Sequence, residues 1–298
     1  MSAIPCAAMD TGLRGPSRTA LMAAMGRAVH SDGPPPHILD DWLAADLAGV
    51  EGRAILDNMR ANVTPDRLQA FQAWTAVRTR FVEDFVESAV AAGVRQYVVL
   101  GAGLDSFAYR HAELLERLTI FEVDHPFSQA WKRRRLDELH ITLPHNVVFA
   151  AVDFETQSLL DALKASGFAL DQRAVLSWIG VTMYLAREAI DATLASIVSC
   201  APGTRIALTY DQPPDVLSDK ARALLADVSG TAAKYGEPFV SLFRQDEIER
   251  LLIEHGFDSV THFGADEAVS RYFGATDVGM ADVQRLVTAV VPKSSPAA

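Results

Sequence analysis

The sequence predicts an α/β fold, with one mostly parallel sheet and helices on both of its faces. Short apolar runs alternate with helical segments from residue 96 onward, which is typical of repeated strand–helix units. The first of these runs stops at Gly101-Ala102-Gly103, and a helical segment follows directly. The 298 residues, of which 49% are hydrophobic, are enough to bury a substantial core around such a sheet.

The chain before this sheet is predicted to form an N-terminal helical accessory region over residues 1–63, followed by a single globular domain over residues 64–298. Apolar residues at helical spacing predict a helix over residues 19–29. The run Gly33-Pro34-Pro35-Pro36 follows that helix and interrupts the chain, because proline cannot continue a helical hydrogen-bond pattern.

A long helix is expected to lead from the accessory region into the sheet. It begins at Thr64-Pro65-Asp66, where threonine is expected to cap the helix and proline suits the first position. Apolar residues then recur at helical steps, namely Leu68, Phe71, Trp74, Val77, Phe81 and Phe85. Gly93 is expected to end the helix, because glycine readily adopts the left-handed conformation found there.

Strands and helices are expected to alternate through the rest of the chain. The strands are expected over residues 96–100, 119–123, 147–152, 174–179, 204–210 and 258–263. The helical segments are expected over residues 107–117, 126–139, 157–165, 187–199, 215–234 and 245–255. In open parallel sheets ligands bind beyond the carboxyl ends of the strands, so the functional site is expected at that edge.

The composition argues against several classes of function. The 27 Lys and Arg residues against 38 Asp and Glu residues give a net charge of −11, so a nucleic-acid partner is not expected. The two cysteines, Cys6 and Cys200, indicate a reducing compartment rather than a disulfide framework. The scattered histidines predict no metal site. Residues 1–10 do not resemble a secretion signal and the apolar stretch 174–186 is too short to span a bilayer, so a cytoplasmic protein without membrane association is expected.

The turn after the first strand bears on which nucleotide is bound. Gly101 and Gly103 allow a tight turn and a close approach of the backbone to a ligand, although a glycine turn without a ligand fits them too. A dinucleotide fingerprint needs a third glycine at position 106, where this chain has Ser106 preceded by Asp105. An acid there would repel a pyrophosphate. S-adenosylmethionine carries a sulfonium and an ammonium and no phosphate, so the turn favours that cofactor.

Acids at the ends of the next two strands fit the same cofactor. Glu122 and Asp124 end the second strand, where a carboxylate can accept from both ribose hydroxyls. Asp153 and Phe154 end the third strand, where an acid can accept from the adenine amine and a ring can pack on the base. A solvated strand end or a helix cap is the alternative interpretation of these acids. Since NAD-binding folds also place an acid after the second strand, a nicotinamide-dependent oxidoreductase is an alternative function.

Several segments together resemble the leucine carboxyl methyltransferase family, which includes bacterial polyketide O-methyltransferases. They are "SRTALMAAMGRAVHS", "AVRTRFVEDFV", "RQYVVLGAGLDSFAYR", "FEVDHP", "GVTMYL", "GEPFVSLF" and "RYFG", in the family's order. The resemblance implies a Rossmann-like class I S-adenosylmethionine-dependent methyltransferase, with a seven-stranded sheet whose last strand is antiparallel and with an N-terminal helical cap. It also implies O-methyl transfer to a small molecule of secondary metabolism.

The resemblance also assigns cofactor contacts. It implies that Arg78 holds the methionine carboxylate in a bidentate pair, with Arg80 as the fallback and a surface ion pair as the structural alternative. The other implied contacts are Gly101, Ala102 and Gly103 under the methionine portion, Asp124 at the ribose with Glu122 and Val123 beside it, Asp153 and Phe154 at the adenine, and Tyr184 near the methionine end.

One position departs from the family's pattern. Where the family usually has a glutamate before "GVTMYL", this chain has Ile179, which is also counted among the cofactor contacts. An isoleucine cannot pair with the cofactor's ammonium. Three consequences fit the sequence: compensation by a backbone carbonyl, weaker cofactor binding, or a protein that binds the cofactor without transferring its methyl group.

The acceptor is predicted only by class. Tyr210 and Asp211 end the fifth strand and are expected to contact the acceptor, although a loop cap accounts for Asp211 equally well. No Ser/His/Asp arrangement supplies a general base, so no catalytic residue is assigned and a carboxylate or acidic phenol is favoured as the acceptor. Apolar residues over 211–240 favour a small, natural-product-like molecule, and the sequence is compatible with a homodimer. The main alternative is a non-methylating protein of the same fold that binds the cofactor or performs a cyclisation or rearrangement.

Overall fold

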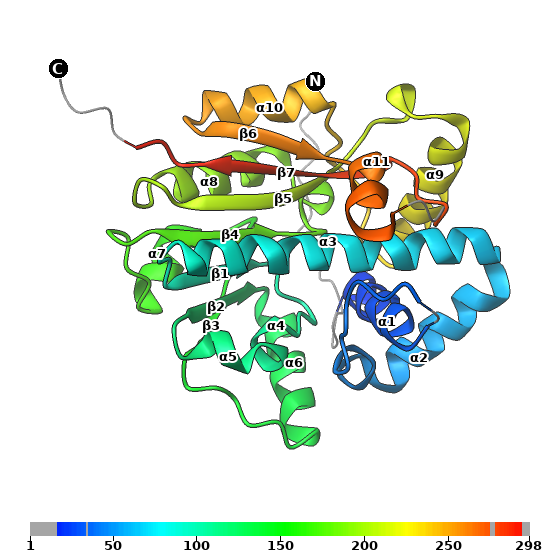
Figure 1. Cartoon of the computed structure of the whole chain (residues 1–298), viewed down its shortest axis with the longest axis horizontal. Coiled ribbons are helices and arrows are strands. Elements are labelled where there is room, and N and C mark those ends of the chain that lie inside the picture. The colour runs from blue at the N-terminus through cyan, green and yellow to red at the C-terminus, as the bar shows by residue number, and fades with distance from the viewer. Residues whose placement is uncertain (1–16, 34, 275–277, 294–298) are drawn as a thin grey trace, which may run out of the picture.

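The computed structural model describes residues 17–33, 35–274 and 278–293, so Cys6 lies outside the described residues. A seven-stranded sheet forms the centre, in the order β3-β2-β1-β4-β5-β7-β6 (Figure 1). Its strands are β1 (Gln96–Leu100), β2 (Thr119–Asp124), β3 (Val147–Ala151), β4 (Ala174–Trp178), β5 (Arg205–Asp211), β6 (Asp258–Phe263) and β7 (Gln284–Val290). β7 runs antiparallel to both of its neighbours, and the other neighbouring strands are parallel. The predicted mostly parallel sheet with an antiparallel last strand is therefore confirmed.

The six strands located from the sequence lie within one residue of their expected bounds. The seventh, β7, was implied by the family resemblance but was not located. Its residues alternate between buried and partly exposed positions along much of its length, unlike the fully buried β1 and β4. Strands buried on both faces appear as continuous apolar runs, which are easier to recognise in a sequence.

The described helices are α1 (Arg18–Asp32), α2 (Ala44–Asn62), α3 (Pro65–Ala91), α4 (Phe107–Arg110), α5 (Ala112–Leu115), α6 (Pro126–Glu138), α7 (Leu159–Ala165), η1 (Thr182–Tyr184), α8 (Arg187–Val198), η2 (Pro214–Val216), α9 (Asp219–Lys234), α10 (Gln245–Glu254), α11 (Ala265–Ala268) and η3 (Val269–Phe273). Two expected helices are interrupted. The segment expected over 107–117 forms α4 and α5, because the backbone leaves the helical region at His111. The segment expected over 215–234 forms η2 and then α9.

The long helix α3 crosses the molecule and connects the sheet with α1 and α2 (Figure 1). Thr64 occupies its N-cap position with an extended backbone, but the threonine side chain makes no capping hydrogen bond, contrary to expectation. Pro65 begins the helix as predicted. Gly93 follows its end with a φ of +90°, a conformation that glycine adopts without steric cost.

Apolar residues cover both faces of the sheet. Val98 and Leu100 of β1 belong to the core cluster that also contains residues of α7, α8 and α10. Tyr97 and Val99 belong to the cluster on the opposite face, which contains residues of α3. This division follows from the alternation of side chains along a strand. Within the described ranges, no helix is both long and apolar enough to cross a membrane.

Candidate functional site

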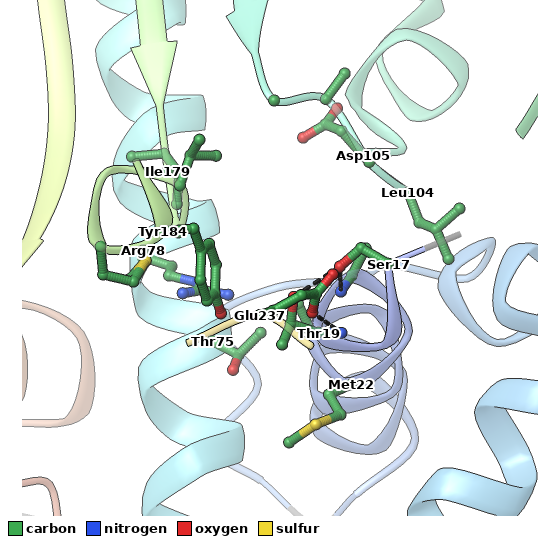
Figure 2. Close-up of a pocket in the computed structure, with 18 of the residues that line it drawn as sticks. Ser17, Thr19, Met22, Thr75, Arg78, Leu104, Asp105, Ile179, Tyr184 and Glu237 are labelled. Atoms are coloured by element: carbon green, nitrogen blue, oxygen red, sulfur yellow. Dashed lines mark hydrogen bonds between the residues drawn. The ribbon is translucent and has the colours of Figure 1, made fainter. Parts of the chain in front are cut away.

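A cavity of about 520 Å³ lies at the carboxyl ends of the parallel strands. Its size falls within the range of about 300–1,000 Å³ typical of small-molecule sites. Ten of the residues predicted from the sequence line it, namely Arg78, Gly101, Ala102, Gly103, Asp124, Asp153, Phe154, Ile179, Tyr184 and Asp211. Residues of α1 line it as well, so the N-terminal region contributes directly to the site (Figure 2).

The glycine turn is held under the cavity by the neighbouring strand. The N–H groups of Gly101 and Ala102 both donate to the carbonyl of Val123, at 2.8 and 3.0 Å. Gly101 has a φ of +68°, and a Cβ there would lie 2.3 Å from a methyl carbon of Val181, so no other residue fits. Val123 itself does not line the cavity, so its predicted cofactor contact is wrong: it holds the turn through its backbone.

Asp124 lies beside the turn, as predicted. Its carboxylate accepts from the N–H of Gly103 and, at 2.6 Å, from the N–H of His125. Burial raises the pKa of Asp124 above its usual value. Glu122 lies elsewhere: it is 2% exposed and pairs with Lys132 of α6 at 2.5 Å. The prediction that Glu122 contacts the cofactor is therefore wrong, because an ammonium buried under α6 neutralises this acid inside the fold.

Asp153 and Phe154 line the far part of the cavity. The carboxylate of Asp153 accepts from the N–H of Glu155 at 3.0 Å and from the hydroxyl of Thr156 at 2.9 Å. These bonds cap the turn after β3, which was the alternative interpretation of this acid. The centre of the Phe154 ring lies 6.3 Å from that of the Trp178 ring. Phe154 lines the cavity next to Asp153. A role for both residues at an adenine ring stays a prediction.

Four side chains from three distant parts of the chain, α3, β5 and β7, form a polar cluster in the cavity, called the Arg78 cluster below. Nη1 of Arg78 donates to Oε1 of Gln284 at 2.9 Å, and Nε1 of Trp74 donates to the same oxygen at 2.9 Å. Nε2 of Gln284 donates to Oδ2 of Asp211 at 2.8 Å. Within the described residues Arg78 and Asp211 are hydrogen-bonded to Gln284 and neither forms an ion pair, so the surface ion pair that was the alternative interpretation of Arg78 is not formed.

Burial shifts the pKa of both charged groups in the Arg78 cluster. Loss of water lowers the pKa of Arg78 to about 10, although Tyr184 and Asp211 oppose this shift. Burial raises the pKa of Asp211 to about 7, against the opposing effects of Gln284 and Arg78. Asp211 is 3% exposed, in agreement with this direction. Each shift means that the charged form is disfavoured without a partner.

Tyr184 and Glu237 face the cavity near the start of α1 (Figure 2). The ring of Tyr184 packs edge-on against Phe239 at 5.3 Å, and burial raises its pKa to about 12. Glu237 accepts from the N–H of Thr19 at 3.3 Å. Ile179 lines the cavity near Arg78 and Tyr184 and brings no charge (Figure 2). Glu237 belongs to the segment "GEPFVSLF" that carried the family resemblance, but it was not predicted as a site residue. Gln284 lies in none of the quoted motifs and reaches the cavity only through the tertiary fold.

Tyr210 does not reach the cavity. Its side chain is fully buried, and its hydroxyl lies 3.1 Å from Nδ1 of His262 on β6. Successive residues of a strand point to opposite faces, so Tyr210 and Asp211 cannot both face one ligand. The prediction of Tyr210 as an acceptor contact is therefore wrong, and Asp211 is the residue of this pair that lines the cavity.

A second polar cluster, called the Arg110 cluster below, borders the cavity, which two of its members, Arg27 and Glu83, line. Arg27 of α1 pairs with Asp41 at 2.6 Å and donates to the carbonyl of Leu104 at 2.7 Å. Arg110 pairs with the other oxygen of Asp41 at 3.3 Å and with Glu83 of α3. These bonds tie α1 and α3 to the segment that follows the glycine turn.

The cavity lining is predominantly acidic. Its carboxylates are Glu83, Asp105, Asp124, Asp153, Asp211 and Glu237, and its guanidinium groups are Arg27 and Arg78. In the part of the chain that the structure describes, no group of three His, Cys, Asp or Glu side chains could hold a metal ion. An acidic lining attracts a cationic guest and repels a phosphate-bearing one.

Comparison with known protein families identifies the family of this chain. Residues 20–198 match the model of the leucine carboxyl methyltransferase family. The chain belongs to that family. The family resemblance expected from the motifs is therefore confirmed, and the glycine turn and its neighbouring strands lie within the matched residues.

Family relatives extend over most of the chain. A Bacillus subtilis protein, "Putative S-adenosyl-L-methionine-dependent methyltransferase YktD", is 31% identical over 280 residues, covering 86% of this chain and 91% of that protein. A Mycobacterium avium protein, "Putative S-adenosyl-L-methionine-dependent methyltransferase", is 37% identical over 193 residues, covering 64% of this chain and 63% of that protein.

Solved structures share the fold. A DUF574 family protein from Streptomyces avermitilis superposes with a TM-score of 0.61 at 16% identity, covering 95% of this chain and 99% of that chain. A "putative methyltransferase from Thermobifida fusca" superposes with a TM-score of 0.60 at 16% identity, covering 98% of this chain and all of that chain. The leucine carboxyl methyltransferase family member described here has the predicted class I methyltransferase fold.

Proposed function

We propose that this chain is an S-adenosylmethionine-dependent O-methyltransferase that acts on a small, natural-product-like molecule. S-adenosylmethionine is its cofactor, as predicted, and the names of its family relatives support this assignment. When bound, S-adenosylmethionine supplies an electrophilic methyl group on a sulfonium.

The observation that carries the proposal is the position of Arg78, without an ion pair in the described chain, in a predominantly acidic cavity. Arg78 is a buried cation that pairs with no carboxylate of the described chain, and most of the charged groups that share its cavity are acids. A guest that suits this lining brings one carboxylate for Arg78 and positive charge for the acids. S-adenosylmethionine has this charge pattern, whereas a nicotinamide dinucleotide brings a pyrophosphate and no carboxylate. The oxidoreductase alternative is therefore disfavoured.

The remaining residues supply binding and orientation. The glycine turn exposes backbone without side chains, so a ligand can approach closely. Each oxygen of Asp124 accepts one backbone N–H and keeps a lone pair, so the carboxylate can still accept from the two hydroxyls of a ribose. Phe154 offers an apolar face for an adenine.

The part of the cavity under α9 suits an apolar acceptor. Its lining residues there are Leu224, Val228, Ala232, Pro238 and Phe239, together with Met22 of α1 and Phe71 of α3. These side chains would exclude water from the acceptor and from its reacting oxygen. A cytoplasmic location belongs to this proposal and is supported by the buried free thiol of Cys200.

A second candidate function rests on Ile179. Because the charge that the family usually has at this position is missing, a protein of this fold that binds the cofactor without transferring the methyl group fits the same cavity. The two functions differ in their products. Only a methyltransferase converts S-adenosylmethionine into S-adenosylhomocysteine together with a methylated acceptor.

The proposal is tested in two steps with the purified full chain. Calorimetry is expected to show micromolar binding of S-adenosylmethionine and S-adenosylhomocysteine and no binding of NAD or NADP. A panel of phenols, alcohols and carboxylates is then screened for S-adenosylhomocysteine formation and for mass gain of the acceptor. Binding of NAD in place of the adenosyl compounds would refute the proposal. Cofactor binding together with cyclised or rearranged products that carry no added methyl would support the second candidate.

A further inference from the structure

We propose that Asp211 takes the ammonium at the amino-acid end of the cofactor and so completes a two-point clamp with Arg78, to which the family resemblance already assigns the carboxylate. Gln284 is the spacer that keeps the two charges apart. This inference rests on the proposed function, because it names the residues that would recognise one end of the proposed cofactor.

The geometry of the Arg78 cluster is that of two opposite charges held apart by one amide. Arg78 and Asp211 both line the cavity, yet they do not pair with each other. The amide of Gln284 lies between them, with its oxygen at 2.9 Å from Arg78 and its nitrogen at 2.8 Å from Asp211. The N–H of Trp74 also donates to the amide oxygen, which fixes the orientation of the amide.

Within the described residues, neither Arg78 nor Asp211 has an opposite charge in contact with it. A guanidinium has several N–H donors, and the structure shows one of them engaged at Arg78. Asp211 accepts one side-chain hydrogen bond, from Gln284. Charges buried without an opposite charge are costly, and the lowered pKa of Arg78 and the raised pKa of Asp211 reflect this cost. A zwitterionic amino-acid group would supply the missing partner to each of them.

The other acids of the cavity are less suitable partners for the ammonium. The carboxylate and the ammonium of an α-amino acid sit on one carbon atom, so their partners must lie in one cluster. Asp124 accepts two backbone N–H groups beside the glycine turn, and Asp105 accepts the N–H of Phe107. Glu237 is engaged at the start of α1. Asp211 is the cavity acid that is hydrogen-bonded into the cluster of Arg78.

The clamp explains how the chain tolerates Ile179. This residue follows β4, and Asp211 ends β5, which is paired with β4 in the sheet. A carboxylate at the end of β5 can therefore face the same part of the cavity as a side chain that follows β4. The ammonium then has an acidic partner even though position 179 brings none.

The clamp also predicts a pH dependence of binding. Asp211 must be ionised to hold an ammonium, so affinity is lost as the pH falls through the raised pKa of about 7. The charged or titratable groups near Asp211 are Arg78 of α3 and Tyr184 of η1, and the uncharged Gln284 of β7 donates a hydrogen bond to it. Burial places the pKa of Arg78 at about 10 and that of Tyr184 at about 12, so neither titrates near pH 7.

The test compares S-adenosylhomocysteine with methylthioadenosine, an adenosine thioether that lacks the amino-acid end. At about pH 8, calorimetry is expected to show that Asp211→Asn lowers the affinity for S-adenosylhomocysteine by about thirtyfold or more. Affinity for methylthioadenosine should stay within about twofold, which shows that the variant is folded. Equal affinity of both proteins for S-adenosylhomocysteine would overturn the clamp.

Two further comparisons keep the test independent of the Asp211 variant. In the wild type, affinity for S-adenosylhomocysteine is expected to fall by about tenfold per pH unit below about pH 7, with no such fall for methylthioadenosine. Equal pH dependence for the two compounds would overturn the clamp. Glu237→Gln removes the same charge from the other side of the cavity. If this variant, and not Asp211→Asn, loses the affinity difference between the compounds, the ammonium lies at Glu237. Failure of S-adenosylhomocysteine to bind the wild type would refute the proposed function itself.

Discussion

The two buried polar clusters of this protein differ in whether their opposite charges are in direct contact. In the Arg110 cluster, two guanidinium groups meet two carboxylates directly, and every charged side chain has an opposite charge beside it. In the Arg78 cluster, one guanidinium and one carboxylate are separated by the amide of Gln284. Both clusters join α3 to other parts of the chain, so position alone does not distinguish them.

The difference separates a structural role from a binding role. A buried ion pair is complete within the chain, and removing one partner leaves an uncompensated charge. Two buried charges that are kept apart leave the folded protein less stable than it could be, which is a common cost of functional sites. Variants in the Arg110 cluster should therefore lower stability, and variants in the Arg78 cluster should weaken binding without lowering stability.

Arg110→Met is expected to have the largest effect, lowering the free energy of unfolding by about 3–5 kcal/mol. The side chain of Arg110 is 6% exposed, and its loss leaves Asp41 and Glu83 with less compensation. Urea unfolding measures the change. Arg134→Met is the control, because Arg134 is 58% exposed and lies 3.8 Å from Glu138, so its loss should cost less than about 1 kcal/mol. Equal effects of the two variants would remove the distinction between the clusters.

Arg78→Met is expected to lower the affinity for S-adenosylhomocysteine by about a hundredfold, or about 3 kcal/mol, because the cofactor's carboxylate would lose its cationic partner. Calorimetry measures this, with methylthioadenosine as the control compound whose affinity should not change. Because burial already disfavours the charged form of Arg78, the variant should unfold at no lower urea concentration than the wild type. A large loss of stability together with unchanged affinity would place Arg78 with the structural cluster.

Asp211→Asn is expected to raise the free energy of unfolding of the unliganded protein by an amount on the order of 2 kcal/mol at about pH 8. The folded pKa of Asp211, about 7, lies above its ordinary value of 3.8, so the folded state binds the proton more tightly. The wild type therefore loses stability as the pH rises from about 4 to about 7, and the variant does not. Urea unfolding at several pH values checks this. A difference in the free energy of unfolding between variant and wild type that is the same at every pH would show that burial does not raise the pKa of Asp211.

Ile179→Glu is expected to have the smallest effect in the wild type, changing the affinity for S-adenosylhomocysteine by less than about threefold. Asp211 would already hold the ammonium there. In the Asp211→Asn background the same change should restore affinity by about tenfold, because a carboxylate returns to that part of the cavity. Calorimetry on the wild type, the two single variants and the double variant measures the gain in affinity in each background. Equal gains in both backgrounds would show that positions 179 and 211 act independently.

The elements of the fold could be predicted from the sequence where a local pattern of residues encodes them. The strands buried on both faces, such as β1 and β4, are continuous apolar runs and were located closely. β7 was missed because its polar residues break such a run and because it is placed between β5 and β6 by tertiary pairing. The N-cap position of Thr64 was correct, but the hydrogen bond expected from its side chain is absent.

Site residues could be predicted from the sequence where they lie at strand ends, but not where they reach the cavity through contacts between distant parts of the chain. Asp124, Asp153 and Asp211 were found because the carboxyl ends of parallel strands share one edge. Tyr210 was assigned wrongly because the sequence does not show which of two adjacent residues faces the cavity. Gln284 was missed because its partner Arg78 lies 206 positions earlier in the chain. No local pattern reports a contact across that distance.

The place of β7 in the sheet has a consequence for protein synthesis. This strand lies between β5 and β6 although the ribosome makes it after both of them. A growing chain therefore carries Arg78 and Asp211 long before it carries Gln284. The amide that lies between the guanidinium and the carboxylate is thus the last of the three groups to be synthesised. The separation of the two charges therefore depends on the pairing of β5 with the strand that is synthesised last.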